Sequence, residues 1–232
     1  MIAICKRLLP AICAGLLVGG PAFAVMIGDV ETWNSGLQGW NQVGWADALS
    51  NPGGYLHVDF FDQADPPPVG QNWDRIYNTS TPPANRFSGD YYNAGIQDVT
   101  FDFQSYGTQI GFISLQWSCT TNSHVWKYTG FSLPPASGPW TTLDAPFSFS
   151  SDWSYGPGST AEEFLSDMSG VSWIGIYIER NGSGAQDYSI DNFTLAGFIP
   201  EPGEWGILGA ALLVTAIALR KDLFRRRLST TG

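Results

Sequence analysis

The chain of 232 residues has few cysteines that could stabilise a fold through disulfide bonds. It contains three cysteines, and two of them, Cys5 and Cys13, lie within the first 24 residues. The remaining one, Cys119, has no partner left for an internal disulfide. The protein must therefore fold on its apolar core. We expect Cys119 to be a small buried hydrophobe there, with an exposed thiol as the alternative.

Basic residues are also scarce in the central part of the chain. Residues 25–199 carry 18 acidic and 4 basic side chains, a net charge of −14, whereas the whole chain carries −10. Phosphate groups are bound by clusters of lysine and arginine, which this stretch lacks. Nucleic acids and anionic lipid surfaces are therefore not expected as partners.

Recognisable catalytic motifs are missing as well. The two histidines, His57 and His124, accompany no Gly-x-Ser-x-Gly turn, and no Cys/His pair has zinc spacing. A glycosidase needs two carboxylates across a cleft, and no spacing singles out such a pair among the acidic residues. We expect a protein that is not an enzyme, and keep a secreted glycan-active hydrolase as the alternative.

The first 24 residues have the features of a secretory signal peptide. Lys6 and Arg7 precede an apolar stretch over residues 8–19, and Ala22 and Ala24 are the small residues at positions −3 and −1 of a cleavage site. We expect signal peptidase to cleave after Ala24. The rest of the chain would then be exported.

The last 35 residues combine three features of different chemistry. Pro200, Glu201 and Pro202 predict an extended segment, because proline restricts its own φ and the residue before it. Residues 205–219 contain no ionisable side chain and predict a short membrane-spanning helix, about 22 Å long. A basic cluster follows, which favours the cytoplasmic side of the membrane. It consists of Arg220, Lys221, Arg225, Arg226 and Arg227.

In this order the three features resemble the PEP-CTERM sorting signal of Gram-negative bacteria that make exopolysaccharide. The resemblance covers residues 200–227 and implies that residues 198–232 are recognised and processed by a membrane-embedded exosortase. It also implies export through the inner membrane, a transiently anchored precursor, and a mature product at the cell surface or outside the cell. A permanently membrane-anchored surface protein is the alternative.

Residues 25–197 predict a single all-β domain. Short segments with alternating apolar and polar residues predict strands, and the proline- and glycine-rich segments between them predict loops. So many short strands favour a β-sandwich of the jelly-roll type. The expected strands cover residues 55–60, 99–103, 110–117, 126–131, 146–150, 173–179 and 189–195.

One short helix is expected within this domain, over residues 159–170. Either Ser159 with Glu162 or Thr160 with Glu163 gives the capping-box pattern of a helix start, and Gly170 can end the helix. Its buried stripe is expected to consist of Phe164, Leu165 and Met168.

Several segments of the domain resemble the laminin B (IV type A) module. They are the heptapeptide 86–92, Arg-Phe-Ser-Gly-Asp-Tyr-Tyr, with the strand pattern 99–103 after it, and residues 161–165 leading into 171–179. That module is a jelly-roll sandwich close in architecture to carbohydrate-binding modules. The resemblance implies a non-catalytic domain that binds exopolysaccharide or matrix partners, although a fold by itself does not determine a ligand.

Tryptophans supply the candidate sugar-binding residues. Trp117 and Trp173 lie in strand patterns with apolar neighbours and are expected in the core. Others lie in loops rich in Gly, Pro, Ser and Asp, where an indole ring can stack on a sugar or fold back as a lid over the core. These candidates for glycan stacking are Trp73, Trp140 and Trp153.

A structural calcium ion is a further candidate, implied by the resemblance to carbohydrate-binding jelly rolls. Such modules often hold Ca²⁺ between an early acidic residue and one on the last strand, which in this acidic domain would also offset local repulsion. The residues at those places are Asp29, Glu31 and Asp191. The alternative for Asp191 is that it caps a turn.

Overall fold

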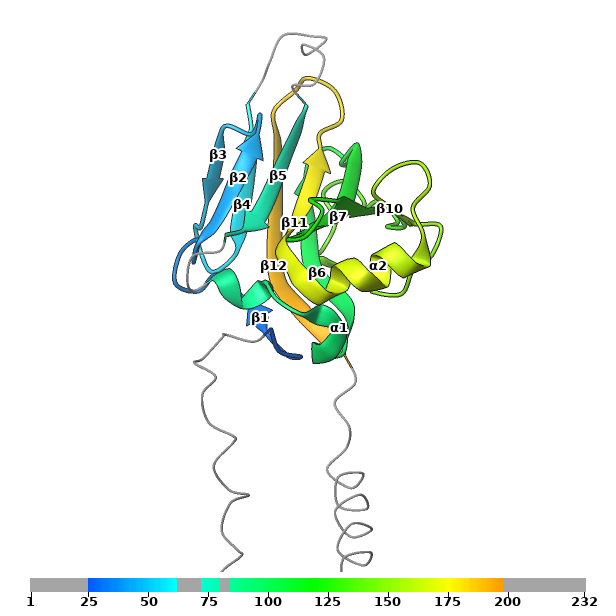
Figure 1. Ribbon diagram of the computed structural model, residues 1–232. Coiled ribbons are helices and arrows are strands. Elements are labelled where there is room, and N and C mark those ends of the chain that lie inside the picture. The colour runs from blue at the N-terminus through cyan, green and yellow to red at the C-terminus, as the bar shows by residue number, and fades with distance from the viewer. Residues whose placement is uncertain (1–24, 62–71, 80–83, 198–232) are drawn as a thin grey trace, which may run out of the picture.

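The computed structural model describes residues 25–61, 72–79 and 84–197, which form two antiparallel sheets packed as a sandwich (Figure 1). The predicted all-β jelly-roll sandwich is confirmed. The predicted signal peptide with Ala22 and Ala24, the segment 200–202, the helix 205–219 and the basic cluster lie outside the described residues. Within the described ranges, no helix has the length and apolar character needed to cross a bilayer.

One sheet, called sheet A here, has the strand order β3-β4-β12-β6-β9, and β1 also pairs with β12. Its strands are β1 Val30–Glu31, β3 Ala48–Ser50, β4 Leu56–Phe60, β6 Ile96–Tyr106, β9 Thr141–Pro146 and β12 Gln186–Gly197. Because the short first strand pairs with the last, residues 25 and 197 lie at the same end of the sandwich (Figure 1).

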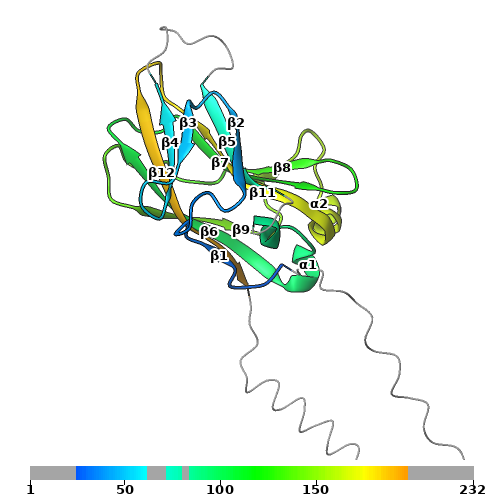
Figure 2. The ribbon, with the colours of Figure 1, turned by 90° about the vertical axis from the view of Figure 1, so that its left-hand side faces the viewer.

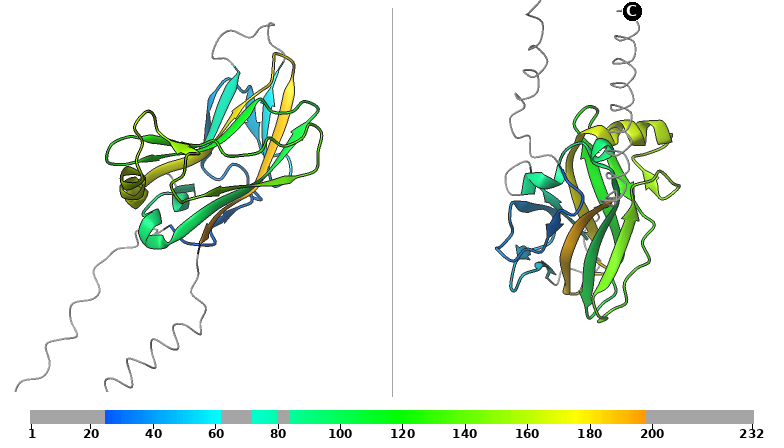
Figure 3. Two further views of the ribbon diagram at one scale, coloured as in Figure 1. Left: turned by 90° about the vertical axis from the view of Figure 1, so that its right-hand side faces the viewer. Right: turned by 90° about the horizontal axis from the view of Figure 1, so that it is seen from below.

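The other sheet, sheet B, has the order β10-β8-β7-β11-β5-β2. Its strands are β2 Trp40–Gly44, β5 Trp73–Asn78, β7 Phe112–Cys119, β8 Val125–Tyr128, β10 Trp153–Ser154 and β11 Val171–Glu179. Figures 2 and 3 show the two layers from the sides and from below. In this sheet β11 pairs with β5 and β7, which come from distant parts of the chain, and this pairing decides where their outward side chains meet.

The core lies between the sheets and is built from the inward residues of each strand. Phe101 and Phe193 come from sheet A, Trp117 and Ile176 come from sheet B, and all four are at most 1% exposed. Cys119 is buried at 3% exposure, as predicted. Apolar burial of this extent is what stabilises a domain without disulfides.

The predicted helix is confirmed in position and in one of its two capping alternatives. α2 spans Ala161–Asp167 and continues as a 3₁₀ turn over Met168–Gly170. Thr160 and Glu163 form the capping box, with the Glu163 amide donating to Thr160 Oγ1 over 3.2 Å. Leu165 departs from the expected stripe, because it is 47% exposed.

A second short helix and several strands differ from the sequence-based expectation. α1, Tyr91–Ala94, is held by the side chain of Asp90 at its start and by Gly95 in the left-handed conformation at its end; a 3₁₀ turn, Ala84–Phe87, precedes it. The strand expected over 146–150 is wrong, since β9 ends at Pro146. Proline has no amide hydrogen for the ladder, and Pro146 takes the last position of the edge strand β9.

Candidate functional site

The outer face of sheet B carries the candidate site. Alternation along β5, β7 and β11 turns every second side chain away from the core. In the observed register Glu179 of β11 lies between Trp73 of β5 and Phe112 of β7, and the next outward residue, Tyr177, lies opposite Arg75. Three strands that are far apart in sequence therefore contribute to one surface.

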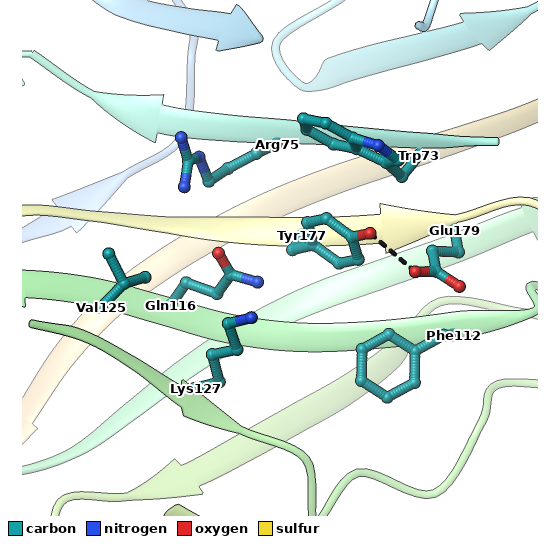
Figure 4. Close-up of a pocket in the computed structure, with 8 residues that line it drawn as sticks. All are labelled: Trp73, Arg75, Phe112, Gln116, Val125, Lys127, Tyr177 and Glu179. Atoms are coloured by element: carbon teal, nitrogen blue, oxygen red, sulfur yellow. Dashed lines mark hydrogen bonds between the residues drawn. The ribbon is translucent and has the colours of Figure 1, made fainter. Parts of the chain in front are cut away.

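An aromatic row crosses these three strands. The rings of Trp73 and Tyr177 stack, with centroids 5.4 Å apart and an angle of 21° between their planes. Phe112 meets Tyr177 edge to face at 6.2 Å. Figure 4 shows the three rings above strands β5, β11 and β7. We call Trp73, Tyr177 and Phe112 the aromatic row.

A pocket of about 400 Å³ opens beside the aromatic row. Its polar lining comes from Gln116 of β7, Lys127 of β8, Arg75 of β5 and Glu179 of β11 (Figure 4). Next to this lining Gly175 pairs with both Gln116 and Tyr77 and leaves the sheet surface bare between them. A Cβ at Gly175 would lie 2.3 Å from the Ile76 carbonyl oxygen, so no larger residue fits.

Tyr177 is held in one orientation and one protonation state. Its hydroxyl donates to Glu179 Oε1 over 2.6 Å. Burial raises the pKa of Tyr177, and the hydrogen bond to Glu179 raises it further. The phenol therefore stays protonated at neutral pH, and the Glu179 carboxylate is fixed beside it.

The two cationic side chains of the pocket have different surroundings. The guanidinium of Arg75 lies over the Trp173 ring at 4.6 Å and over the Tyr77 ring at 5.7 Å. Burial lowers the pKa of Arg75, but a guanidinium keeps its charge at any physiological pH. Lys127 is exposed. Both charges are therefore present at the site.

The three tryptophans predicted to stack on a glycan lie in different surroundings. Trp73 is the first residue of β5 and joins the aromatic row. Trp140 is 39% exposed and meets Tyr55 edge to face at 5.9 Å, away from the pocket. The prediction that Trp153 is free to stack on a glycan is wrong, because Trp153 is 2% exposed and its Nε1 donates to the Pro146 carbonyl oxygen over 2.7 Å. It packs in the core and has no face free for a sugar.

Most of the site residues were missed from the sequence. Trp173 was expected in the core, but it faces outward beneath Arg75. The available signal was the alternation over 173–179, which places Trp173, Tyr177 and Glu179 on one face of the strand, opposite Ile174 and Ile176. That pattern alone did not show which strands would lie beside this one.

The candidate calcium ligands do not gather into one cluster. Glu31 is fully buried and accepts a hydrogen bond from Arg86 at 3.0 Å and from the Trp33 amide at 2.9 Å. Asp29 Oδ2 accepts from the Met26 amide, and Asp191 Oδ1 from the Asn192 amide. Among the described residues, the three carboxylates do not form a group of ligand atoms within 4.8 Å of one another, and a calcium ion shared by Asp29, Glu31 and Asp191 stays a prediction. The first and last strands are joined by backbone pairing.

A different group of metal-ligand types lies on the outer face of sheet A. Within the described ranges, ligand atoms of His57, Asp59 and Asp187 all lie within 4.8 Å of one another. His57 Nδ1 lies 3.3 Å from Ser189 Oγ. Burial raises the pKa of Asp59, and the neighbouring Asp187 raises it further. All three residues are half-exposed, as are many acidic groups that hold no ion.

The retained hydrolase alternative needs a pair of carboxylates across a cleft. Among the described residues that line the pocket on sheet B, Glu179 is the one carboxylate, and it is already bound to Tyr177. The adjacent carboxylates Asp59 and Asp187 lie on the opposite sheet. The pocket therefore has binding groups but no such pair.

Comparison with known proteins gives the fold. No family model and no curated protein matches the chain. The solved structure of PfGH50B matches 75% of this chain with 14% identity and a TM-score of 0.50, and this chain spans 24% of its length.

Two smaller solved domains are also similar. The family 11 carbohydrate-binding module of the cellulosomal cellulase Lic26A-Cel5E of Clostridium thermocellum has 16% identity and a TM-score of 0.48, over 77% of this chain and 99% of that one. The L4b domain of human laminin alpha-2 has 11% identity and a TM-score of 0.47, over 75% of this chain and 99% of that one. At these identities the likenesses concern the fold, and a ligand must be argued from the site.

Proposed function

We propose that the described domain is a non-catalytic glycan-binding module and that the outer face of sheet B is its binding surface. The observation that carries this proposal is the aromatic row beside the polar pocket. A sugar ring has an apolar face of C–H groups and a rim of hydroxyls. The row of Trp73, Tyr177 and Phe112 suits the apolar face, and Gln116 and Glu179 suit the hydroxyls.

The rigidity of the surface supports this proposal. The aromatic row lies on three adjacent strands of a six-stranded sheet, and the hydrogen bond from Tyr177 to Glu179 fixes two of the side chains. Side chains that are ordered before binding lose little conformational entropy on binding. A volume of about 400 Å³ is also within the range of small-ligand sites.

The two ends of the chain extend the proposal to the protein's location. We propose that residues 1–24 direct export through the inner membrane and that an exosortase processes the chain near Pro200, Glu201 and Pro202. The module would then act at the cell surface or in the matrix, with exopolysaccharide as the proposed ligand. Weighing the mature protein from cells with and without the exosortase distinguishes processing from permanent anchoring.

Replacing Trp73 by alanine is expected to weaken glycan binding about thirtyfold, because a central aromatic contact typically contributes about 2 kcal/mol. The measurement is binding of the full-length chain to a glycan array and then calorimetry with the best ligand. The protein is purified in a detergent without a sugar headgroup, since such headgroups would compete.

Trp140→Ala is the matched control for this experiment, because Trp140 is an exposed tryptophan outside the pocket. It is expected to bind as the unmodified chain does. Equal losses in both variants, or a loss in Trp140→Ala alone, would place the site elsewhere. No binding to any glycan would contradict the proposed function itself.

A further inference from the structure

The two outer faces of the sandwich carry opposite charge. The outward positions of sheet A hold six aspartates and no lysine or arginine. They are Asp59, Asp98, Asp102, Asp144, Asp187 and Asp191. The pocket on sheet B instead holds two basic residues, Arg75 and Lys127, and one acidic residue, Glu179. In a domain with a strong negative net charge, the pocket is thus a local positive region.

The four basic side chains of the described residues fall into two classes. Arg86 is paired with Glu31 at 3.0 Å, and Arg180 is 2% exposed and donates to the Phe61 carbonyl oxygen. Both are used inside the fold. Within the described ranges, the side chains of Arg75 and Lys127 make no ion pair, and no hydrogen bond is formed by either. Their N–H groups can therefore donate hydrogen bonds to a ligand.

The positions of these two charges fit an oligosaccharide rather than a single sugar. Lys127 is on β8 and Arg75 on β5, with β7 and β11 between them. Three strand spacings separate their strands, about 14 Å. Tyr177 and Gln116 lie between the two charges. Trp73 is the outward residue of β5 that precedes Arg75. A stacked chain of sugars could present an acidic group at each end of this span.

The chemistry of Arg75 favours an oxyanion. Stacking on Trp173 occupies the face of its guanidinium and leaves the N–H groups along the edge as donors. A guanidinium edge matches the two oxygens of a carboxylate or a sulfate. The repulsion between an anionic ligand and the distant aspartates of sheet A is screened over about 8 Å in physiological salt.

Resting on the proposed function, we propose that the ligand of this site is an anionic polysaccharide, whose carboxylate or sulfate groups are bound by Arg75 and Lys127 while its rings stack on the aromatic row. Uronic acids and sulfate esters share this chemistry, and the test separates them. Neutral polysaccharides would lack partners for both charges.

The test compares three probes on the full-length chain: oligosaccharides of alginate, of carrageenan and of laminarin, which are carboxylated, sulfated and neutral. We expect one of the anionic probes to bind at least tenfold more tightly than laminarin, with affinity that falls as salt rises. Lys127→Gln and Arg75→Gln are each expected to weaken that binding about tenfold, since a hydrogen bond to a charged group has about that effect.

Two further variants make the outcomes distinguishable. Asp144→Asn changes the net charge by one unit of the opposite sign, on the opposite face, and is expected to leave affinity unchanged. Lys127 is exposed, so Lys127→Gln keeps the test valid if Arg75→Gln fails to fold. Preference for laminarin, or anionic binding that neither variant weakens, would overturn this inference. The proposed function would survive either result if Trp73→Ala still weakened binding about thirtyfold.

Discussion

Replacing Asp167 by alanine is expected to lower the free energy of unfolding by about 3 to 5 kcal/mol, because it breaks a buried charged network. Asp167 is the last residue of α2 and is 2% exposed. Its carboxylate accepts hydrogen bonds from Trp126 Nε1 at 2.9 Å and from Asn122 Nδ2 at 2.7 Å, and it lies 2.9 Å from His124 Nδ1. These contacts join α2 to the β7–β8 hairpin.

The charge of Asp167 is what makes the expected loss large. Burial alone would raise the pKa of this carboxyl, but the hydrogen bonds from Trp126, His124 and Asn122 outweigh it and lower the pKa below its ordinary value. Alanine would leave these donors without their acceptor, at the cost of desolvating each one. Because the folded-state pKa is lowered, the stabilisation is complete above about pH 4 and is lost as the pH falls further.

Urea unfolding of Asp167→Ala at pH 7 and pH 3 tests this prediction. The exposed Asp144 offers a matched control, since its side chain makes no hydrogen bond or ion pair within the described part of the chain, and Asp144→Ala is expected to change stability by less than about 0.5 kcal/mol. A loss below about 1 kcal/mol at pH 7 would show that the network contributes little. A loss that is equal at both pH values would show that the charge of Asp167 is not its cause.

Replacing Asp74 by asparagine is expected to stabilise the protein above pH 7, by up to about 4 kcal/mol. Asp74 is fully buried in β5, and neither of its carboxylate oxygens has a hydrogen-bond partner among the described residues. Burial raises its pKa to about 7, and the neighbouring Arg75 offsets only part of that effect. Gly44 allows this close packing, because a Cβ there would lie 2.4 Å from Asp74 Oδ1.

The sign of the pH dependence follows from the raised pKa of Asp74. In the unfolded chain this carboxyl ionises near pH 4, whereas in the folded domain it does so near pH 7. The folded state holds the extra proton between these values, so stability declines as the pH rises from 4 to 7 and is lowest above that. Asparagine carries no charge to be desolvated and should remove this decline.

The measurement is the difference in unfolding free energy between Asp74→Asn and the unmodified chain at pH 4, 6 and 8. We expect a difference close to zero at pH 4 that grows through pH 6 to its maximum at pH 8. A variant that is less stable at pH 8, or a difference that does not depend on pH, would mean that the carboxyl is ionised in the fold and has a partner.

The long strands could be predicted because their sequences alternate without interruption. Residues 56–60 follow the pattern buried, half-exposed, buried through all five positions, and 99–103 does the same. Most strands that were missed are short or at edges, such as β1 with two residues and β10 with two. The exception is β5, which has six residues and lies between β11 and β2. Such strands exist because a neighbour offers free hydrogen-bonding groups, and a single segment does not encode that neighbour.

The site could be predicted only in part for a related reason. Trp73 was identified from its polar, proline-rich surroundings, and the same reasoning failed for Trp153, whose polar flanks conceal a buried ring. Tyr177 and Phe112 gain their significance from the register of β11 with β5 and β7. That register is set by pairing between residues far apart in the chain, which local alternation does not reveal.

A crystal structure of the protein with a bound oligosaccharide tests the central claim most directly, because it locates the ligand on one face of the sandwich. We expect a sugar ring stacked on Trp73 or Tyr177 and an acidic group within hydrogen-bond distance of Arg75 or Lys127. A saccharide seated on the aspartates of sheet A, with the aromatic row left free, would contradict it.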